Sequence, residues 1–139
     1  MKLLKHFFNI LISIILLFVQ IGCTNQKSDE FKQALDLYKQ NKLEKALPLF
    51  ENLVSNHKSD AEILAWLAET YRRLGEKIKT LQTAEQALNL DTCNSFAHTV
   101  IATVCNKQPY DELLNSDTTW IHINKAVQCN PEDGNAWVF

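Results

Sequence analysis

Cysteine and histidine are the residues of this chain whose side chains could bind a metal or carry out redox chemistry. The cysteines are Cys23, Cys93, Cys105 and Cys129, and the histidines are His6, His57, His98 and His122. The cysteines form no C-x-x-C spacing, and the histidines form no H-E-x-x-H arrangement. The sequence therefore predicts no metal site, no cofactor and no thioredoxin-like chemistry.

Glycine-dependent catalytic motifs are also excluded. Glycine occurs only at positions 22, 75 and 134, so the chain has no P-loop, no G-x-G-x-x-G and no G-x-S-x-G. The adjacent carboxylates Asp111 and Glu112 are interpreted more simply as a solvated turn than as an acid–base pair. A net charge of −2 gives no electrostatic footprint for nucleic acid. We therefore predict a protein that is not an enzyme and does not bind nucleic acid.

The elements that must position any functional side chain are amphipathic helices, most clearly in residues 61–94. Leu64, Leu67, Ala68, Tyr71 and Leu74 recur at spacings of three and four, which places them on one helix face. Gly75 can adopt the left-handed conformation that ends a helix. A second inward stripe is predicted at Ile78, Leu81, Ala84, Ala87, Leu88 and Leu90. Packed together, these two predicted helices still leave one side apolar, so further helices must cover it.

Residues 61–94 resemble a tetratricopeptide repeat (TPR), a helix pair of about 34 residues. Counted from Ala61, Ala68 takes the eighth place, Gly75 the fifteenth and Ala87 the twenty-seventh, where that family keeps small residues or Gly. The frame fits again one period earlier, where Asn41 replaces the turn Gly, and one period later, with roughly five extra residues. Thr80, Ala84 and Thr92 depart from the family pattern.

The resemblance implies an all-α fold: a right-handed superhelical stack of antiparallel helix pairs, or α-solenoid, of about three repeats plus the start of a fourth. We expect one domain over 30–139, with repeats near 27–60, 61–94 and 95–133 and an insertion near 109–116. Pro48 should face outward in a helix over 43–56. In the last helix, the inward residues should be Trp120, Ile123, Ala126 and Val127. Residues 132–139 look like the opening of a fourth unit. They predict either that the chain is a fragment or that a short apolar tail folds back on the third unit.

In TPR arrays the first helix of each unit lines a concave groove that takes a protein or peptide. The resemblance places Phe31, Leu35, Tyr38, Glu69, Arg72, Arg73, Phe96, Asn106 and Lys107 in this groove. One of the two arginines is expected to pair with Glu69 and the other to remain free for a partner's carboxylate. Some family members hold a terminal carboxylate with a Lys/Asn/Arg clamp; Phe31, Leu35 and Val100 stand in its place here, which argues against that use. Phe31 and Tyr38 are equally consistent with core packing.

The first 22 residues have the layout of a secretory signal. Lys2 and Lys5 precede an apolar run over 7–19, which is short for a membrane span of about 20 residues. Gly22–Cys23 resembles the end of a bacterial lipoprotein signal, which implies lipidation of Cys23, although Gln20 replaces the usual aliphatic residue. Residues 23–29 would then be the lipidated cysteine and a linker. An uncleaved signal anchor, or a signal cut elsewhere, is the alternative.

The remaining cysteines follow from the repeat frame. Cys105 lies on a core stripe and should pack as a small hydrophobe. Cys93 and Cys129 close successive units, and the sequence leaves open whether they form a disulfide. His98 and His122 are expected at the surface or half-buried.

These features predict a non-enzymatic scaffold or adaptor in the cell envelope. It would be anchored by lipid on Cys23 to the periplasmic or surface side of a bacterial membrane and would bind a protein partner. The alternative is that the chain is the interaction region of a longer enzyme or envelope-assembly protein. A redox or metal protein is a third interpretation.

Overall fold

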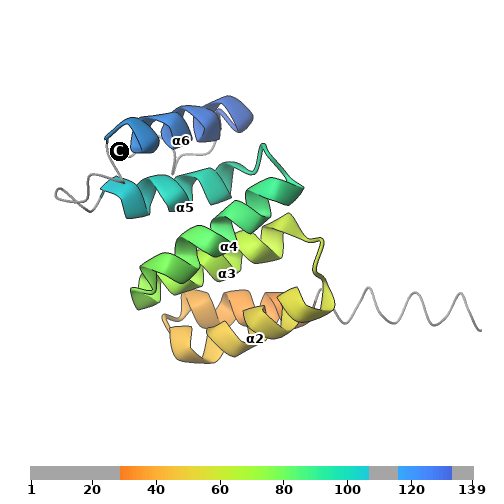
Figure 1. Cartoon of the computed structure of the whole chain (residues 1–139). Helices are drawn as coiled ribbons and strands as arrows, with labels where there is room; N and C mark the ends of the chain where they lie inside the picture. Colours follow the sequence, from red (N-terminus) through yellow and green to blue (C-terminus); the bar gives the residue numbers. More distant parts are fainter. Residues whose placement is uncertain (1–28, 107–115, 133–139) are drawn as a thin grey trace, which may run out of the picture.

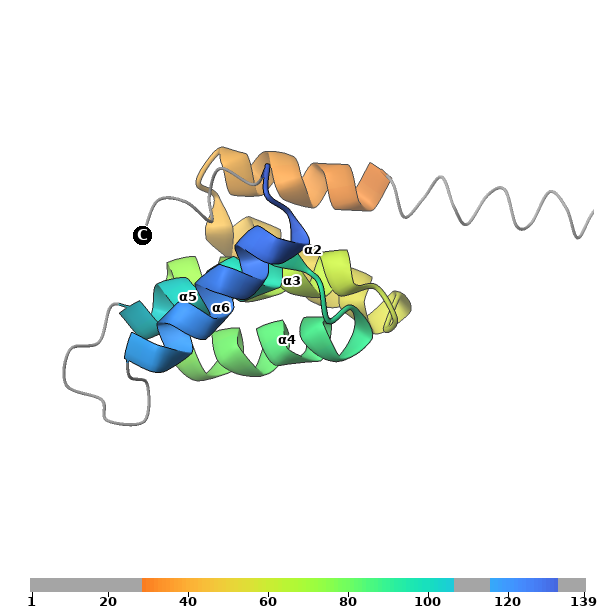
Figure 2. The same ribbon diagram turned by 90° about the horizontal axis from the view of Figure 1, so that it is seen from above.

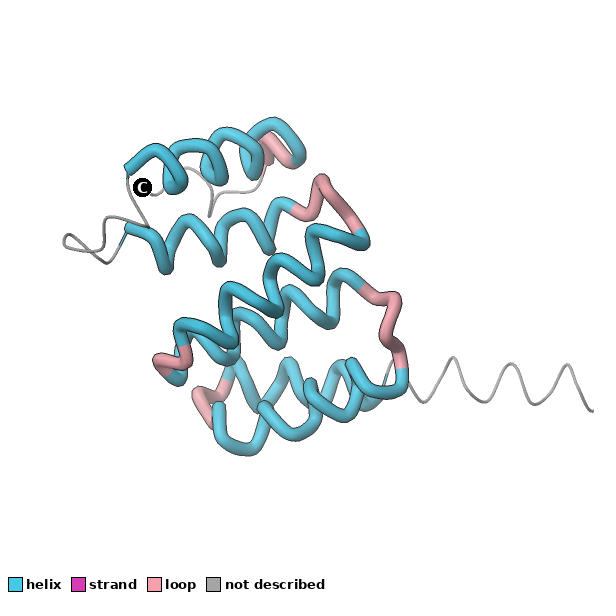
Figure 3. The backbone as a smooth tube through the Cα atoms, in the orientation of Figure 1, coloured by secondary structure: helices cyan, strands magenta, loops and turns pink. Residues whose placement is uncertain are grey.

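The computed structural model describes residues 29–106 and 116–132, and all the regular secondary structure in these residues is helical. Residues 29–39 form the first described helix. It is followed by α2 (Leu43–Asn56), α3 (Ala61–Leu74), α4 (Lys77–Leu90), α5 (Ser95–Asn106) and α6 (Ser116–Cys129). Successive helices form antiparallel pairs, and the pairs stack from the first to α5–α6 (Figure 1, Figure 3). This confirms the predicted all-α stack of helix pairs.

Several predictions fall on residues outside these ranges: the signal and Cys23, the insertion near 109–116, and the start of a fourth unit. Among the described helices, none is long and apolar enough to cross a membrane.

The repeat appears directly in the hydrogen bonds that end and begin helices. Asn41 and Gly75 are 75 − 41 = 34 positions apart and both have positive φ, 60° and 84°. The residue after each donates its N–H to a carbonyl five positions back, at Leu37 and Tyr71, which is the Schellman cap. Asp60 and Asn94, also 94 − 60 = 34 apart, accept N–H bonds from the next helix as N-caps. The turn after the first helix is therefore built like the turn after α3, and the turn before α3 is built like the turn before α5.

Alanines mark the places where helices approach most closely. Ala34, Ala68 and Ala102 occupy the same place in successive units, and all three are 0% exposed. Ala46, Ala84, Ala87, Ala97 and Ala126 are equally buried. Larger buried side chains, such as Phe50 and Leu53, fill the space between these contacts. Cys105 is 2% exposed and packs in the core as predicted.

The inward stripe of α4 was predicted partly wrongly. Ile78 and Leu90 are 72% and 48% exposed, whereas Thr80 is 0% exposed. The Thr80 hydroxyl donates to the Glu76 carbonyl at 2.9 Å, so its polar group is satisfied within the helix and the residue can be buried. The prediction counted only apolar residues and so missed the threonine positions on this face.

The same kind of error occurs in α6. Trp120, predicted inward, is 60% exposed, and Thr119 is buried beside Ile123 and Ala126 instead. Pro48 is exposed as predicted, on the outer side of α2.

A disulfide joins Cys93, in the turn before α5, to Cys129, the last residue of α6, with their Cα atoms 5.3 Å apart. This answers the pairing that the sequence left open. The bridge closes the third helix pair at one end.

Replacing Ala68 by Leu should lower the free energy of unfolding by about 1–3 kcal/mol, because the added side chain has no room at this helix contact. Denaturant titration followed by circular dichroism measures this change. Glu85→Gln, at an exposed site of α4, is the control and should stay within about 0.5 kcal/mol. Equal effects at the two sites would contradict the assigned close approach.

Candidate functional site

Three aromatic side chains from three successive helix pairs form a continuous row, which we call the aromatic row. Tyr38 of the first helix contacts Trp66 of α3, with ring centroids 5.3 Å apart, and Trp66 contacts Phe96 of α5 at 4.7 Å. All three residues are half-buried and pack against the core clusters, so part of the surface of each remains accessible. The row therefore gives the first helices one shared apolar surface.

Tyr38 and Phe96 were predicted groove residues, but Trp66 was missed. Its neighbour Ala65 is buried at 1% exposure. Trp66 stands three before Glu69 and seven before Arg73, spacings that share a helix face. An aromatic residue on the face of two predicted groove residues was the signal that could have identified it.

Glu69 is the centre of a polar cluster beside the aromatic row. The residue is 7% exposed, and its carboxylate accepts two bonds from Arg72, from Nε at 2.6 Å and Nη2 at 2.7 Å. The Tyr38 hydroxyl donates to the same carboxylate at 2.7 Å. A buried carboxylate needs such partners, because an unpaired charge is costly away from water. The cluster thus ties α3 to the first helix.

The pKa values in this cluster shift in the directions that these contacts require. Burial, and then the hydrogen bond to Glu69, raise the pKa of Tyr38. The hydrogen bond to Glu69 also raises the pKa of Arg72, so its guanidinium stays charged. Tyr38 therefore acts as a neutral donor at neutral pH, and Arg72 as the cation that balances Glu69.

Arg73 also lies beside Tyr38. Its Nη2 donates to Asn41 Oδ1 at 2.6 Å, and its guanidinium carbon lies 4.8 Å from the centre of the Tyr38 ring. Arg72 pairs with Glu69, as expected for one of the two arginines, whereas Arg73, which was expected to be free, is hydrogen-bonded to Asn41. Both contacts of Arg73 are uncharged, however, and its side chain is exposed. Its positive charge is therefore available to an anion.

Phe31 and Leu35 serve the core of the first pair. Both are half-buried against the cluster that contains Phe50, and the Phe31 ring meets the Phe50 ring edge-on, with centroids 6.2 Å apart. Val100, the third residue at the clamp places, is 1% exposed. The side chain of Asn106 and the whole of Lys107 lie outside the described residues.

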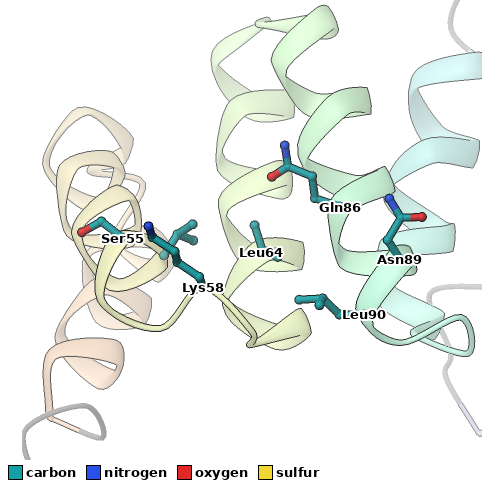
Figure 4. Close-up of a pocket in the computed structure, with 7 residues that line it drawn as sticks. Ser55, Lys58, Leu64, Gln86, Asn89 and Leu90 are labelled. Carbon is teal, nitrogen blue, oxygen red and sulfur yellow. The ribbon is translucent and has the colours of Figure 1, made fainter.

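A separate cleft of about 430 Å³ lies between α2 and α4, with Leu64 of α3 at its base (Figure 4). We call it the back cleft; its lining residues are Val54, Ser55, Lys58, Leu64, Gln86, Asn89 and Leu90. Lys58 is the single titratable residue of this lining, so the cleft has no set of groups for acid–base or nucleophilic catalysis. Across residues 29–106 and 116–132, no three His, Cys, Asp or Glu side chains gather where they could hold a metal ion.

Comparisons with known proteins identify the fold. No protein-family model matches the chain, and no curated protein sequence matches it. Solved structures do match. A thermophilic TPR protein of Thermus thermophilus superposes with a TM-score of 0.70 at 20% identity, over 79% of this chain and 60% of that one. The TPR domain of Arabidopsis OM64 gives 0.70 at 17% identity, over 82% and 90%.

The fold is that of a TPR α-solenoid. The second TPR domain of human RPAP3, in complex with an HSP70 peptide, also superposes with a TM-score of 0.64 at 18% identity, over 78% of this chain and 86% of that domain. In solenoids of stacked repeats, the curvature creates an extended concave binding surface. The aromatic row and the cluster around Glu69 lie on the first helices of this TPR stack.

Replacing Glu69 by Gln should destabilise the protein by about 1.5–3 kcal/mol, because it leaves the half-buried Arg72 without its carboxylate. Urea denaturation of the variant and of the exposed Glu85→Gln control measures the difference. A stability loss no larger than that of the control would mean that the pairing of Glu69 with Arg72 adds nothing measurable to stability.

Proposed function

We propose that this chain is a non-enzymatic scaffold or adaptor that binds a protein or peptide partner along its first helices. The observation that carries the proposal is the aromatic row of Tyr38, Trp66 and Phe96, which runs unbroken across three helix pairs. Half-buried aromatic rings offer large apolar contact area with little loss of side-chain entropy, and Trp, Tyr and Arg dominate the binding energy of interfaces. The peptide complex of the RPAP3 domain, which has the same fold, supports this use.

The chemistry of the face suggests the kind of segment that it binds. The row would take apolar or aromatic side chains of an extended peptide. Arg73, next to Tyr38 and paired only with neutral groups, would take a carboxylate in two hydrogen bonds. The clamp places hold Phe31, Leu35 and Val100, which cannot grip a terminal carboxylate. We therefore expect an internal segment with apolar residues beside an acidic one.

We further propose that the protein is tethered to a membrane of the cell envelope through a lipid on Cys23. The charged start, the apolar run over 7–19 and the Gly22–Cys23 pair support this. Each buried methylene of an acyl chain adds about 0.8 kcal/mol of membrane affinity, so two or more chains anchor firmly. Residues 23–29 would then hold the helical domain near the membrane surface.

Peptides selected for binding from a random display library should lose affinity by roughly tenfold or more when Phe96 is replaced by Ala, because an aromatic anchor of an interface is worth about 1.4 kcal/mol or more. Arg73→Ala should weaken acidic peptides while leaving the melting temperature nearly unchanged, since Arg73 is exposed. Fluorescence titration of a labelled peptide measures the affinity.

Trp120→Ala is the matched control, because Trp120 is an exposed aromatic residue of α6 outside the aromatic row. It should leave the affinity unchanged. Affinity that survives Phe96→Ala and falls with Trp120→Ala would place the binding surface on α6 instead.

Cys23→Ala should move the protein from the membrane fraction to the soluble fraction, or stall its processing, because the lipid would have no attachment site. Detergent partitioning and mass spectrometry of the intact protein measure this. Unchanged partitioning together with an unchanged mass would rule out a lipid on Cys23 while leaving peptide binding untouched.

A further inference from the structure

Two different links join α6 to the turn between α4 and α5 and to the start of α5. The first is the Cys93–Cys129 disulfide. The second is a histidine pair: His98 Nδ1 and His122 Nδ1 lie 2.8 Å apart, and His98 Nε2 lies 3.2 Å from the Thr92 carbonyl oxygen. We call the five residues of these links the clasp: Thr92, Cys93, His98, His122 and Cys129. His98 is 3% exposed, more buried than the sequence predicted.

The position of α6 makes these links important. α6 packs mainly on α5 and lies along it in both ribbon views (Figure 1, Figure 2), whereas α4 packs on both α3 and α5. The outer side of α6 carries Trp120 and Ile121, which are 60% and 56% exposed. A helix with one main packing partner has fewer buried contacts to lose and opens locally at lower cost. The clasp therefore acts on a helix that packs mainly on one neighbour.

The histidine pair assigns a tautomer to each ring and requires His98 Nδ1 to be unprotonated. A carbonyl oxygen only accepts, so His98 Nε2–H donates to Thr92, and His98 Nδ1 is then the acceptor. His122 must donate from Nδ1–H. A proton added to both rings would place two N–H groups face to face. The bond between α5 and α6 therefore depends on the protonation state of the pair.

The surroundings favour the neutral state. Burial lowers the pKa of His122 to about 4, and the neighbouring His98 and Lys125 act in the same direction. Burial also lowers the pKa of His98; the Thr92 carbonyl and Asp91 in the turn oppose this shift, and Lys125 of α6 adds to it. At neutral pH both rings are uncharged and the pair is intact.

We propose that the clasp is a redox-gated latch: a thiol–disulfide oxidoreductase or other dithiol opens the Cys93–Cys129 bridge, and docking of α6 then depends on the His98–His122 hydrogen bond. This goes beyond the proposed function and does not depend on it. With the bridge closed, the covalent constraint keeps α6 in place. With the bridge open, acidification releases it.

The exchange reaction balances as follows. Cys93 is exposed and Cys129 half-buried, so a reductant thiolate attacks Cys93 Sγ. A mixed disulfide forms, the Sγ–Sγ bond breaks, and Cys129 leaves as a thiolate that takes up a proton. The second thiol of the reductant then attacks the mixed disulfide and releases Cys93, which is also protonated. Two electrons and two protons reach the protein, and the dithiol becomes a disulfide.

The direction of the pH effect follows from the lowered histidine pKa values. Undocked histidines have an ordinary pKa near 6.5, so between that value and about 4 the undocked state binds more protons than the docked state. The contribution of the pair to docking is complete above pH about 6.5 and is lost as the pH falls through this window.

Hydrogen–deuterium exchange of the intact chain tests the proposal, with α3 as the internal reference for the pH dependence of exchange itself. The protein is reduced with dithiothreitol at neutral pH, and alkylation followed by mass spectrometry verifies two new thiols. Relative to α3, exchange in α6 should rise at least about tenfold on reduction, because the loop constraint is removed. It should rise again at pH about 5 in the reduced protein and little in the oxidised protein.

Variants separate the two parts of the latch. Cys93→Ser with Cys129→Ser should reproduce the reduced state without reductant. In that background His122→Gln should remove the further rise in α6 exchange at pH about 5, which we call the pH step. The matched control His57→Gln, in the turn before α3, should keep this step. Unchanged α6 exchange after verified reduction of the native chain would overturn the latch. A pH step that persists in His122→Gln would overturn the role of the histidine pair.

Discussion

The close approach of helices at alanine positions is the constraint on which the rest of this structure depends. Ala34, Ala68 and Ala102 recur at the same place in each unit and have no exposed surface. A helix pair of this length cannot bury its apolar face alone, and only small residues let neighbouring backbones come near enough for dispersion contacts to accumulate. Once these contacts are set, the first helices of the three pairs must lie beside one another.

The candidate binding face is a consequence of that stacking. Tyr38, Trp66 and Phe96 belong to different helix pairs and meet only because the pairs are in register. The Glu69 carboxylate is buried at the same junction, where Tyr38 and Arg72 satisfy it. The polar cluster and the aromatic row therefore have two roles: they hold adjacent units together, and they shape the surface that a partner would meet. Arg73 alone of this group is exposed and has no charged partner among the described residues.

The third helix pair is held in a different way from the first two. Its core is built on the same alanine place, yet α6 leaves Trp120 and Ile121 exposed and packs mainly on α5. A disulfide connects it to the turn before α5, and a histidine pair connects it to α5 itself. Links of this kind depend on redox state and on pH, whereas apolar packing depends on neither. In the proposed latch, docking of this helix responds to redox state and pH.

The sequence by itself indicated the all-helical fold, the period of the helix pairs and the turn residues Asn41 and Gly75. These follow from local physics: the 3.6-residue period, the left-handed conformation at Asn41 and Gly75, and small residues at fixed places. Only the tertiary structure decided the use of side chains that lie between helices. Thr80 is buried and Ile78 exposed because a hydroxyl bonded within its own helix removes the expected penalty. Four contacts join residues that are distant in the sequence: Trp66 with Phe96, Arg73 with Asn41, Cys93 with Cys129, and His98 with His122. Such contacts depend on how the helices are placed in space, which no local sequence pattern encodes.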